Sequence, residues 1–307
     1  MSVGWHSIHV YYHADHDPLL LACLEPLLAR PVGTSSPLKL FFIRHWQGGP
    51  HVRLRVLAED SADSFSLEET VGQFLLRCPS ESNIDERAYA VVQSRFGGLE
   101  ASVASAHIWP NNTVRREPYH PEYGKYGGES GVAMAEDLFV ESTRVSIAAI
   151  RGIAGSSNRR LGFGFTMFLS AALAFGLAPR EVAVFAAAYE RAWSSYITLE
   201  IRARWDRLVE SHLPALRGTA ERILCGAVSP LARPWAEAIE IASRQLEGSG
   251  TCIFDAMELD MPRADKRRML LMQYIHTHNN RLGIDVDHEA YLCHMVRACL
   301  DQLGLSA

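Results

Sequence analysis

Residues 48–56 read Gly-Gly-Pro-His-Val-Arg-Leu-Arg-Val, and this stretch decides the fold of the N-terminal part of the chain. Strict alternation on a β-strand places His51, Arg53 and Arg55 on one face and the aliphatic residues between them on the other. Three potential cations in a row need an anion close by. The stretch therefore predicts a strand with one apolar face and one anion-binding face.

A second strand, predicted from Leu38 to Trp46, precedes this stretch and completes a hairpin. Residues 47–50 read Gln-Gly-Gly-Pro, a turn-forming run that lets the two strands pair. Arg44 joins the cationic face if the register of the hairpin allows it. The alternative interpretation is an exposed sheet face whose cations are solvated. The apolar run 40–43 indicates interior sheet, where guanidinium groups persist only beside a cleft or carboxylates, and this favours the anion-binding interpretation.

The composition excludes several classes of protein. The chain has 307 residues, 48% of them hydrophobic, and a formal net charge of -5, so it buries a large core and lacks the basic surface of a sequence-independent nucleic-acid binder. The six cysteines lack zinc-site spacing and the N-terminus lacks a signal-peptide pattern, which predicts reduced thiols and a cytoplasmic location. The apolar run 161–179 is interrupted by glycines and is predicted to be a buried helix, not a membrane span.

Sequence patterns divide the chain near residue 130. Strand alternation runs from Trp5 to His13, helices are predicted at 19–29 and 66–78, and a long polar loop is predicted between about 100 and 130. Beyond it, periodicity predicts helices at 134–152, 166–176, 179–213, 214–224, 234–247, 264–282 and 288–303. The fold class is therefore α+β, with an N-terminal antiparallel mixed sheet with hairpins, a mostly helical C-terminal half, and one composite core in a single domain over residues 1–307.

The segment from Tyr119 to Gly128 combines polar side chains with glycines that permit close backbone approach. It contains Lys125 and Tyr126, which are candidates to contact a ligand. The alternative interpretation is an ordered loop that packs tyrosines beneath a helix start, with residues 129–130 as the cap.

A third polar group lies in the predicted helix 264–282. His276 and Asn280 are one helical turn apart, and Gln273 lies one turn before them, so the three form a continuous polar line. A helix-borne histidine beside an amide suits a positioned acid or base. A surface or capping role near the helix end is equally well supported by the pattern.

The residues predict neither a metal site nor a nucleotide site. The run His-Ala-Asp-His-Asp at 13–17 lies in a predicted turn without an identifiable third ligand from a distant element. The phosphate-binding loop, the nucleophile elbow and the dinucleotide-binding glycine pattern are all absent from the sequence.

Five motifs, in this order, resemble one family: Trp5 with His9-Val10-Tyr11-Tyr12; Phe42-Ile43-Arg44 with residues 49–55; Tyr119-x-Pro121-Glu122-x-x-Lys125-Tyr126-Gly127-Gly128; Glu136-x-x-Phe139-x-x-Ser142; and His276-x-x-x-Asn280-Arg281-Leu282. Over residues from about 5 to 300 the chain resembles the C-terminal, elimination-type domain of lantibiotic dehydratases, also called the thiopeptide-type bacteriocin biosynthesis domain. It is similar to the stand-alone, split forms, which lack the large N-terminal glutamylation domain. The resemblance implies an enzyme that matures ribosomally made precursor peptides.

The first reaction that the resemblance implies is elimination of glutamate from Ser or Thr side chains that a partner enzyme has glutamylated, which leaves dehydroalanine or dehydrobutyrine. It assigns Arg53, Arg55 and His276 as catalytic residues, because guanidinium groups stabilise enolate-like and carboxylate charge and a histidine moves protons to or from the leaving group. At the position of a further family arginine stands Lys125, which keeps the charge and loses the bidentate fork. The candidates for substrate binding are Arg44, His51, Lys125, Tyr126, Tyr274, Asn280 and Arg281.

The second reaction that the resemblance implies is that of a pyridine synthase, a formal (4+2) cycloaddition of two dehydroalanines with macrocyclisation and release of the leader peptide. That chemistry depends on shape and on a hydrogen-bonding acid or base, for which Tyr274, Gln273 and His276 are candidates. The two hairpin arginines favour elimination, whereas Lys125 favours cycloaddition.

A non-catalytic alternative is a subunit that binds the leader peptide as an added strand on the sheet edge and recruits the partner enzyme. The partners expected from the resemblance are the precursor peptide, with its leader and core, and the glutamylating enzyme. Nucleic acid and membrane are not expected as direct partners. Long helices with apolar faces are compatible with a homodimer, and packing in the core explains those faces equally well. Neither chemistry implies a cofactor.

Overall fold

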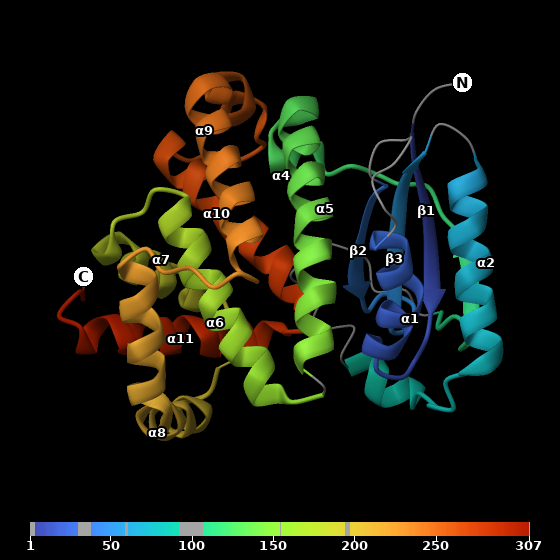
Figure 1. Cartoon of the computed structure of the whole chain (residues 1–307), viewed down its shortest axis with the longest axis horizontal. Coiled ribbons are helices and arrows are strands. Elements are labelled where there is room, and N and C mark those ends of the chain that lie inside the picture. Colours follow the sequence, from blue (N-terminus) through green and yellow to red (C-terminus); the bar gives the residue numbers. More distant parts are fainter. Residues whose placement is uncertain are drawn as a thin grey trace. The chain divides into compact units, whose positions relative to one another are not determined.

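The computed structural model describes residues 4–29, 38–58, 61–91, 107–153, 155–193 and 197–306. The chain forms two compact units, residues 1–120 and 121–307, which we call the sheet unit and the helical unit. Figure 1 shows an α+β chain, with all the strands in the first unit and only helices among the described elements of the second. The fold class predicted from the sequence is confirmed. The single domain with one composite core remains a prediction.

The sheet unit contains a four-stranded antiparallel sheet in the order β2-β3-β1-β4. Its strands are β1 (Gly4–Tyr11), β2 (Lys39–His45), β3 (His51–Ala58) and β4 (Thr113–Arg116). The hairpin of β2 and β3 confirms the sequence prediction. Strand β4 was not predicted, because its four residues Thr-Val-Arg-Arg carry no apolar alternation and lie in what reads as a polar loop. Residues 92–106, which include the start of that loop, lie outside the described residues.

Two helices, α1 (Asp17–Leu28) and α2 (Ser61–Arg77), cover the apolar face of this sheet. The side chains of Val10, Val52 and Leu54 on that face have no exposed surface. Helix α2 is anchored at its C-terminal end, where the Tyr12 ring lies 5.7 Å from the Phe74 ring. Burial of these apolar side chains is the main term that stabilises the unit.

The helical unit contains α4 (Tyr123–Tyr126), α5 (Gly128–Ile153), α6 (Ser157–Ala174), α7 (Pro179–Ala192), α8 (Leu199–Leu224), α9 (Arg233–Ala256), α10 (Arg263–Leu282) and α11 (Val286–Gln302). Most of these helices begin before the predicted first residue, because polar first turns carry no apolar periodicity. Residues 129–130, predicted as a cap, lie inside the first turn of α5.

One predicted helix, 179–213, is two helices. Helix α7 ends at Ala192, and α8 starts at Leu199 after Thr198, whose side chain accepts the backbone N–H of Ile201. The predicted boundary at Pro214 is also wrong, since α8 continues through that residue. The apolar periodicity continues across the break and therefore does not reveal it. Thr198 marks the break, because its side chain caps the start of α8.

Helix α6 is buried along its apolar residues, as predicted for the run that begins at residue 161. Among the described residues, no helix is both long and apolar enough to cross a bilayer. Helix α10 packs against α5, α6 and α9, and α11 packs against α7, α8 and α6. Figure 1 shows α10 beside α5 and α11 running across the lower part of the unit.

Candidate functional site

The cationic face predicted from the alternation of β3 is present in the sheet unit. His51, Arg53 and Arg55 alternate with Val52 and Leu54, which are fully buried on the other side. The register brings further side chains to the same face, because residues directly opposite each other on neighbouring strands share a face. We define the cationic face as His9, His45, His51, Arg53, Arg55 and Arg115.

The hypothesis that Arg44 joins this face is wrong. The register pairs Arg44 with Val52, so its side chain lies on the apolar face, whereas His45 pairs with His51. Arg44 Nη2 lies 2.6 Å from Asp17 Oδ1, and the two side chains are 14% and 10% exposed. Arg44 therefore joins β2 to the first turn of α1. A register shift of one residue would move every side chain of the strand to the other face of the sheet, and the register could not be predicted from the sequence.

Two imidazoles hold the Arg53 guanidinium in place. Its Nε donates to His51 Nε2 at 3.1 Å, and its Nη2 lies 3.0 Å from His45 Nδ1. His51 Nδ1 lies 2.9 Å from the carbonyl oxygen of Gly49. That contact assigns the proton of the neutral ring to Nδ1, which leaves Nε2 as the acceptor for Arg53.

Two histidines of the cationic face, His9 and His51, are neutral at neutral pH. Burial lowers the pKa of His51 to about 2. Burial, followed by the charges of Arg53 and Arg55, lowers the pKa of His9 to about 3, and His45 and Arg115 contribute to the same shift. The guanidinium groups thus lie close enough to act on one imidazole, and they supply the positive charge of the face.

Aromatic rings flank the outer arginines of the face. The Cζ of Arg55 lies 4.3 Å from the centre of the Tyr119 ring. The Cζ of Arg115 lies 3.5 Å from the centre of the Trp109 ring, and its Nε donates to Glu117 Oε1 at 2.9 Å. Stacking of this kind restricts guanidinium groups to fixed orientations while it leaves their charge in place.

Lys125 and Tyr126, the two predicted ligand contacts of the segment Tyr119–Gly128, lie in the helical unit, one at its surface and one in its core. Lys125 Nζ lies 3.2 Å from Glu122 Oε1 in an ion pair whose side chains are 33% and 60% exposed. Tyr126 is buried, with its ring parallel to that of Tyr274 at 6.2 Å. Of the two predicted substrate-binding residues in this segment, only Lys125 is placed at the surface.

A tight turn sets the geometry around His276. Helix α10 ends at Gly283, which adopts φ 76°, and the Ile284 backbone N–H returns to the carbonyl oxygen of Asn279 at 2.9 Å. Asp285 then caps α11 by accepting the backbone N–H of His288 at 2.9 Å. This turn directs the first turn of α11 back alongside the end of α10.

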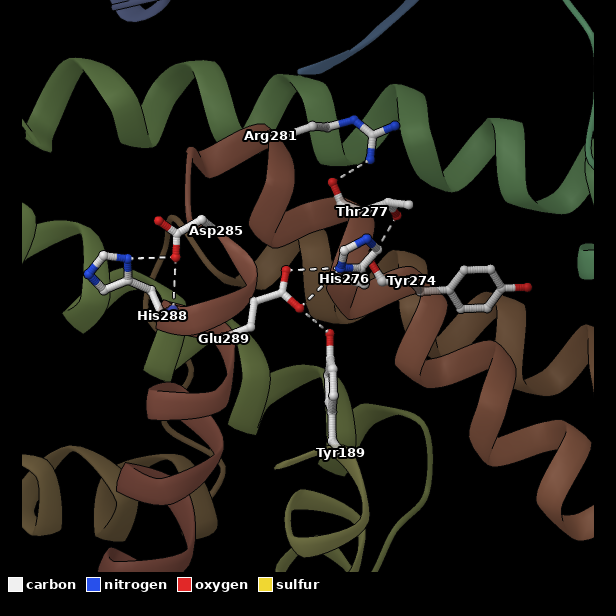
Figure 2. Close-up of polar contacts among 8 residues, drawn as sticks. All are labelled: Tyr189, Tyr274, His276, Thr277, Arg281, Asp285, His288 and Glu289. Carbon is white, nitrogen blue, oxygen red and sulfur yellow. Dashed lines mark hydrogen bonds and ion pairs between the residues drawn. The ribbon is translucent and has the colours of Figure 1, made fainter. Parts of the chain in front are cut away.

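As a result, Glu289 of α11 lies against His276 of α10, as Figure 2 shows. His276 Nδ1 is 3.0 Å from both carboxylate oxygens of Glu289. From α7, Tyr189 donates its hydroxyl to Glu289 Oε2 at 2.8 Å. The carboxylate is only 1% exposed, and the His276 side chain is 28% exposed. The Trp193 ring packs 5.6 Å from the imidazole.

The polar line predicted along α10 is confirmed, since Gln273, His276 and Asn280 are all half-buried on one side of the helix. Tyr274 and Arg281 lie on another side and are each 1% exposed. Arg281 donates to the carbonyl oxygen of Thr277 at 2.9 Å. The burial of Tyr126, Tyr274 and Arg281 favours packing over direct substrate contact, and their predicted binding role is untested.

His278, the other histidine of this helix, is a core residue. It is 1% exposed, its ring stacks on Trp235 at 4.3 Å, and its Nδ1 lies 2.8 Å from Ser142 Oγ. Burial lowers its pKa to about 3, so it is neutral.

Sequence reasoning missed His9, Arg115, Glu289 and Tyr189. The alternation of residues 5–11 predicted a strand that contains His9. Only the pairing of β1 with β3 shows that His9 lies opposite Arg53 on the same face. Glu289 and Tyr189 gave no signal, since Glu289 lies in the next helix, whose direction is set by the turn at Gly283, and Tyr189 lies in the distant helix α7. In the parts of the chain that the structure describes, no three His, Cys, Asp or Glu side chains form a metal-binding group.

The chain is similar to known proteins over nearly its whole length. A family model described as "Lantibiotic biosynthesis dehydratase C-term" matches residues 5–300. No curated protein matches the sequence. Several solved structures are similar in fold, and three of them are described below. Each of the three is less than 25% identical to this chain, so the likeness shows the fold alone.

The structure titled "Pyridine synthase, TbtD, from thiomuracin biosynthesis" has a TM-score of 0.79 at 21% identity and covers 97% of this chain and 98% of its own. TsrL has a TM-score of 0.66 at 17% identity, over 98% and 95% of the two chains. The tRNA-dependent lantibiotic dehydratase MibB from Microbispora sp. 107891 has a TM-score of 0.59 at 18% identity, over 98% of this chain and 28% of its own.

Proposed function

The chain belongs to the lantibiotic biosynthesis dehydratase C-terminal family, and from that premise we propose that it eliminates glutamate from glutamylated Ser and Thr residues of a precursor peptide. The products are dehydroalanine and dehydrobutyrine. The family acts on ribosomally made precursor peptides, so the substrate class follows from membership. The reaction itself is inferred from the chemistry of the cationic face.

One observation carries the proposal, namely the set of guanidinium groups around His9. The side chains of Arg53, Arg55 and Arg115 are held by imidazole, tyrosine and tryptophan rings on one face of the sheet. Fixed guanidinium groups in a half-buried setting bind carboxylates through charge-assisted hydrogen bonds. A glutamyl ester presents one free carboxylate on its leaving group and gains a second as the Cβ–O bond breaks, whereas a dehydroalanine side chain presents none.

The elimination breaks the Cα–H bond and the Cβ–O bond of the esterified residue and forms the Cα=Cβ double bond. Negative charge develops on the carbonyl next to Cα and then on the departing glutamate. In the proposal, Arg53 and Arg55 stabilise that charge, and His276 with Glu289 accepts or delivers the proton. Preorganised donors of this kind contribute about 3 kcal/mol each to the transition state.

The test uses a chemically glutamylated precursor peptide and mass spectrometry of the product. The native protein is expected to release one glutamic acid for each modified residue. Arg53→Ala is expected to lower the elimination rate by about 10² to 10³-fold. The matched control is Arg116→Ala, because Arg116 lies on β4 next to Arg115, points to the opposite face and pairs with Glu68 there. Equal rates for Arg53→Ala and Arg116→Ala would contradict the proposal.

The second candidate function is the pyridine synthase reaction. The observation in its favour is the likeness to TbtD over nearly the whole of both chains, whereas MibB is matched over 28% of its length. A peptide that contains two dehydroalanines, incubated with the protein, is the discriminating substrate. Ring formation with release of the leader, retained in Arg53→Ala and lost in His276→Ala, would establish this function in place of elimination.

The remaining expectations are part of the same proposal. A glutamylating partner enzyme supplies the substrate, and the reaction takes place in the cytoplasm, where the precursor is made. Analytical ultracentrifugation would show whether the protein is a homodimer. The non-catalytic alternative, a leader-binding subunit, predicts that neither test substrate changes mass and that Arg53→Ala retains its binding to the leader.

A further inference from the structure

We propose that Glu289 and Tyr189 are positioning residues that hold the His276 ring with its proton on Nδ1, so that Nε2 is the nitrogen that exchanges protons with the substrate. The inference rests on the proposed function, in which His276 moves a proton. It concerns three residues from three helices, α10, α11 and α7 (Figure 2).

The contact distances support this assignment of the proton. Both oxygens of Glu289 lie 3.0 Å from His276 Nδ1. An ionised carboxylate only accepts hydrogen bonds, so the atom that donates in this contact is Nδ1. A neutral imidazole carries one N–H, and the second nitrogen is then an acceptor with a lone pair.

Tyr189 fixes the carboxylate in turn. Its side chain is fully buried, and its hydroxyl donates to Glu289 Oε2 at 2.8 Å. Burial, followed by the charge of Glu289, holds the pKa of Tyr189 well above its ordinary value, so the hydroxyl keeps its proton and remains a donor. Glu289 is therefore held from one side by a phenol and faces His276 on the other.

The three side chains form a hydrogen-bonded chain that runs from the core to the surface of the helical unit. Tyr189 has no exposed surface, Glu289 has 1% and the His276 side chain has 28%. A buried carboxylate is costly unless hydrogen bonds satisfy it, and the phenol and the imidazole provide them. A purely structural pair would also join α10 to α11, so the experiment has to separate proton placement from helix packing.

The chain offers a matched control only one helical turn away. Asp285 Oδ1 and His288 Nδ1 form a second carboxylate–histidine contact, at 2.8 Å, whose side chains are 59% and 53% exposed. Asp285→Asn keeps a side chain that caps α11 and removes the charge of an exposed pair. It therefore perturbs the same turn without touching His276.

The experiment compares Glu289→Gln, Tyr189→Phe and Asp285→Asn on the full chain. The first readout is the side-chain nitrogen NMR spectrum of His276, which distinguishes a proton on Nδ1 from one on Nε2. The second is kcat and KM for glutamate elimination. Glu289→Gln is expected to mix or reverse the two ring forms and to lower kcat by about 10² to 10⁴-fold with little change in KM. Tyr189→Phe is expected to lower kcat by about fivefold, and Asp285→Asn to change neither readout.

The outcomes separate this inference from the proposed function. If the native protein eliminates nothing but Glu289→Gln still moves the proton of His276, the proposed function fails while the positioning role stands. If Glu289→Gln leaves the ring form of His276 unchanged, or changes it while kcat stays within twofold of the native value, the positioning role is overturned. A Glu289→Gln protein that does not fold is replaced in the comparison by Tyr189→Phe, whose unaltered NMR spectrum and kcat would overturn it equally.

Discussion

Acid is predicted to destabilise the sheet unit before the helical unit, because three histidines of the sheet unit are neutral when folded. Burial lowers the pKa of His16 and of His9 to about 3 and that of His51 to about 2. In the unfolded chain each of them titrates near 6.5. The folded values lie below the unfolded ones, so stability is complete above about pH 6.5 and falls as the pH drops toward the folded values.

The size of the effect follows from proton linkage. At about pH 5, a buried histidine that is neutral when folded and has an unfolded pKa near 6.5 costs about 2 kcal/mol relative to pH 7.5. The result does not depend on the exact folded pKa, since pH 5 lies well above each of them. His16 and His51 contribute this amount each, and solvent screening reduces the share of the half-buried His9 to about 1 kcal/mol.

The sheet unit is therefore expected to lose about 5 kcal/mol between pH 7.5 and 5, a large part of the 5–15 kcal/mol typical of a domain. The helical unit contains His278 as its corresponding neutral histidine and is expected to lose about 2 kcal/mol. Carboxylates titrate below this pH window for the most part, which isolates the histidine effect.

The assay is urea-dependent hydrogen exchange followed by mass spectrometry, which gives an opening free energy for peptides of each unit at a series of pH values. His16→Gln keeps a donor for the Tyr12 carbonyl oxygen, which lies 2.9 Å from His16 Nε2, and is expected to reduce the slope by about 1.4 kcal/mol per pH unit. His212→Gln, at an exposed site of the helical unit, is the control and is expected to leave the slope of the sheet unit unchanged. A slope in the sheet unit below that of one proton between pH 6 and 5 would refute the reasoning.

Three further predictions concern stability and reactivity. Arg44→Met is expected to lower the free energy of unfolding by about 3 kcal/mol in urea titrations, because it leaves Asp17 charged and nearly buried; a loss below about 0.5 kcal/mol would contradict this. Gly127→Ala is expected to cost more than about 2 kcal/mol, since Gly127 has φ 91° and a Cβ there would collide with the backbone of Ile253; an unchanged melting temperature would contradict it. Burial raises the pKa of Cys23 to about 12, so Cys23 is expected to resist alkylation by iodoacetamide until the protein is unfolded, as peptide mapping would show.

Several features could be predicted from the sequence because they depend on local pattern. The alternation of residues 51–56 predicted a strand with one apolar and one cationic face, and the structure has both. The spacing of Gln273, His276 and Asn280 predicted a polar line on one helix, which is also present. The α+β class followed from the order of such segments, whereas the family followed from the resemblance carried by five ordered motifs.

Other features required the strand register and the pairing of distant segments. Whether Arg44 or His45 joins Arg53 depends on a one-residue choice of register, which turn geometry and packing decide. The four-residue strand β4 became recognisable only by its pairing with β1, which brings Arg115 to the cationic face.

The sequence by itself determined the periodicities, and so which side chains share a face of one strand or helix, because side-chain direction repeats with the backbone of that element. Only the tertiary structure decided which faces meet. Glu289 reaches His276 through a glycine-terminated turn, and Tyr189 reaches Glu289 through the packing of α7 against α11. The protonation states of the buried histidines were decided there too, since desolvation exists only once a side chain is enclosed by segments that are remote in the chain.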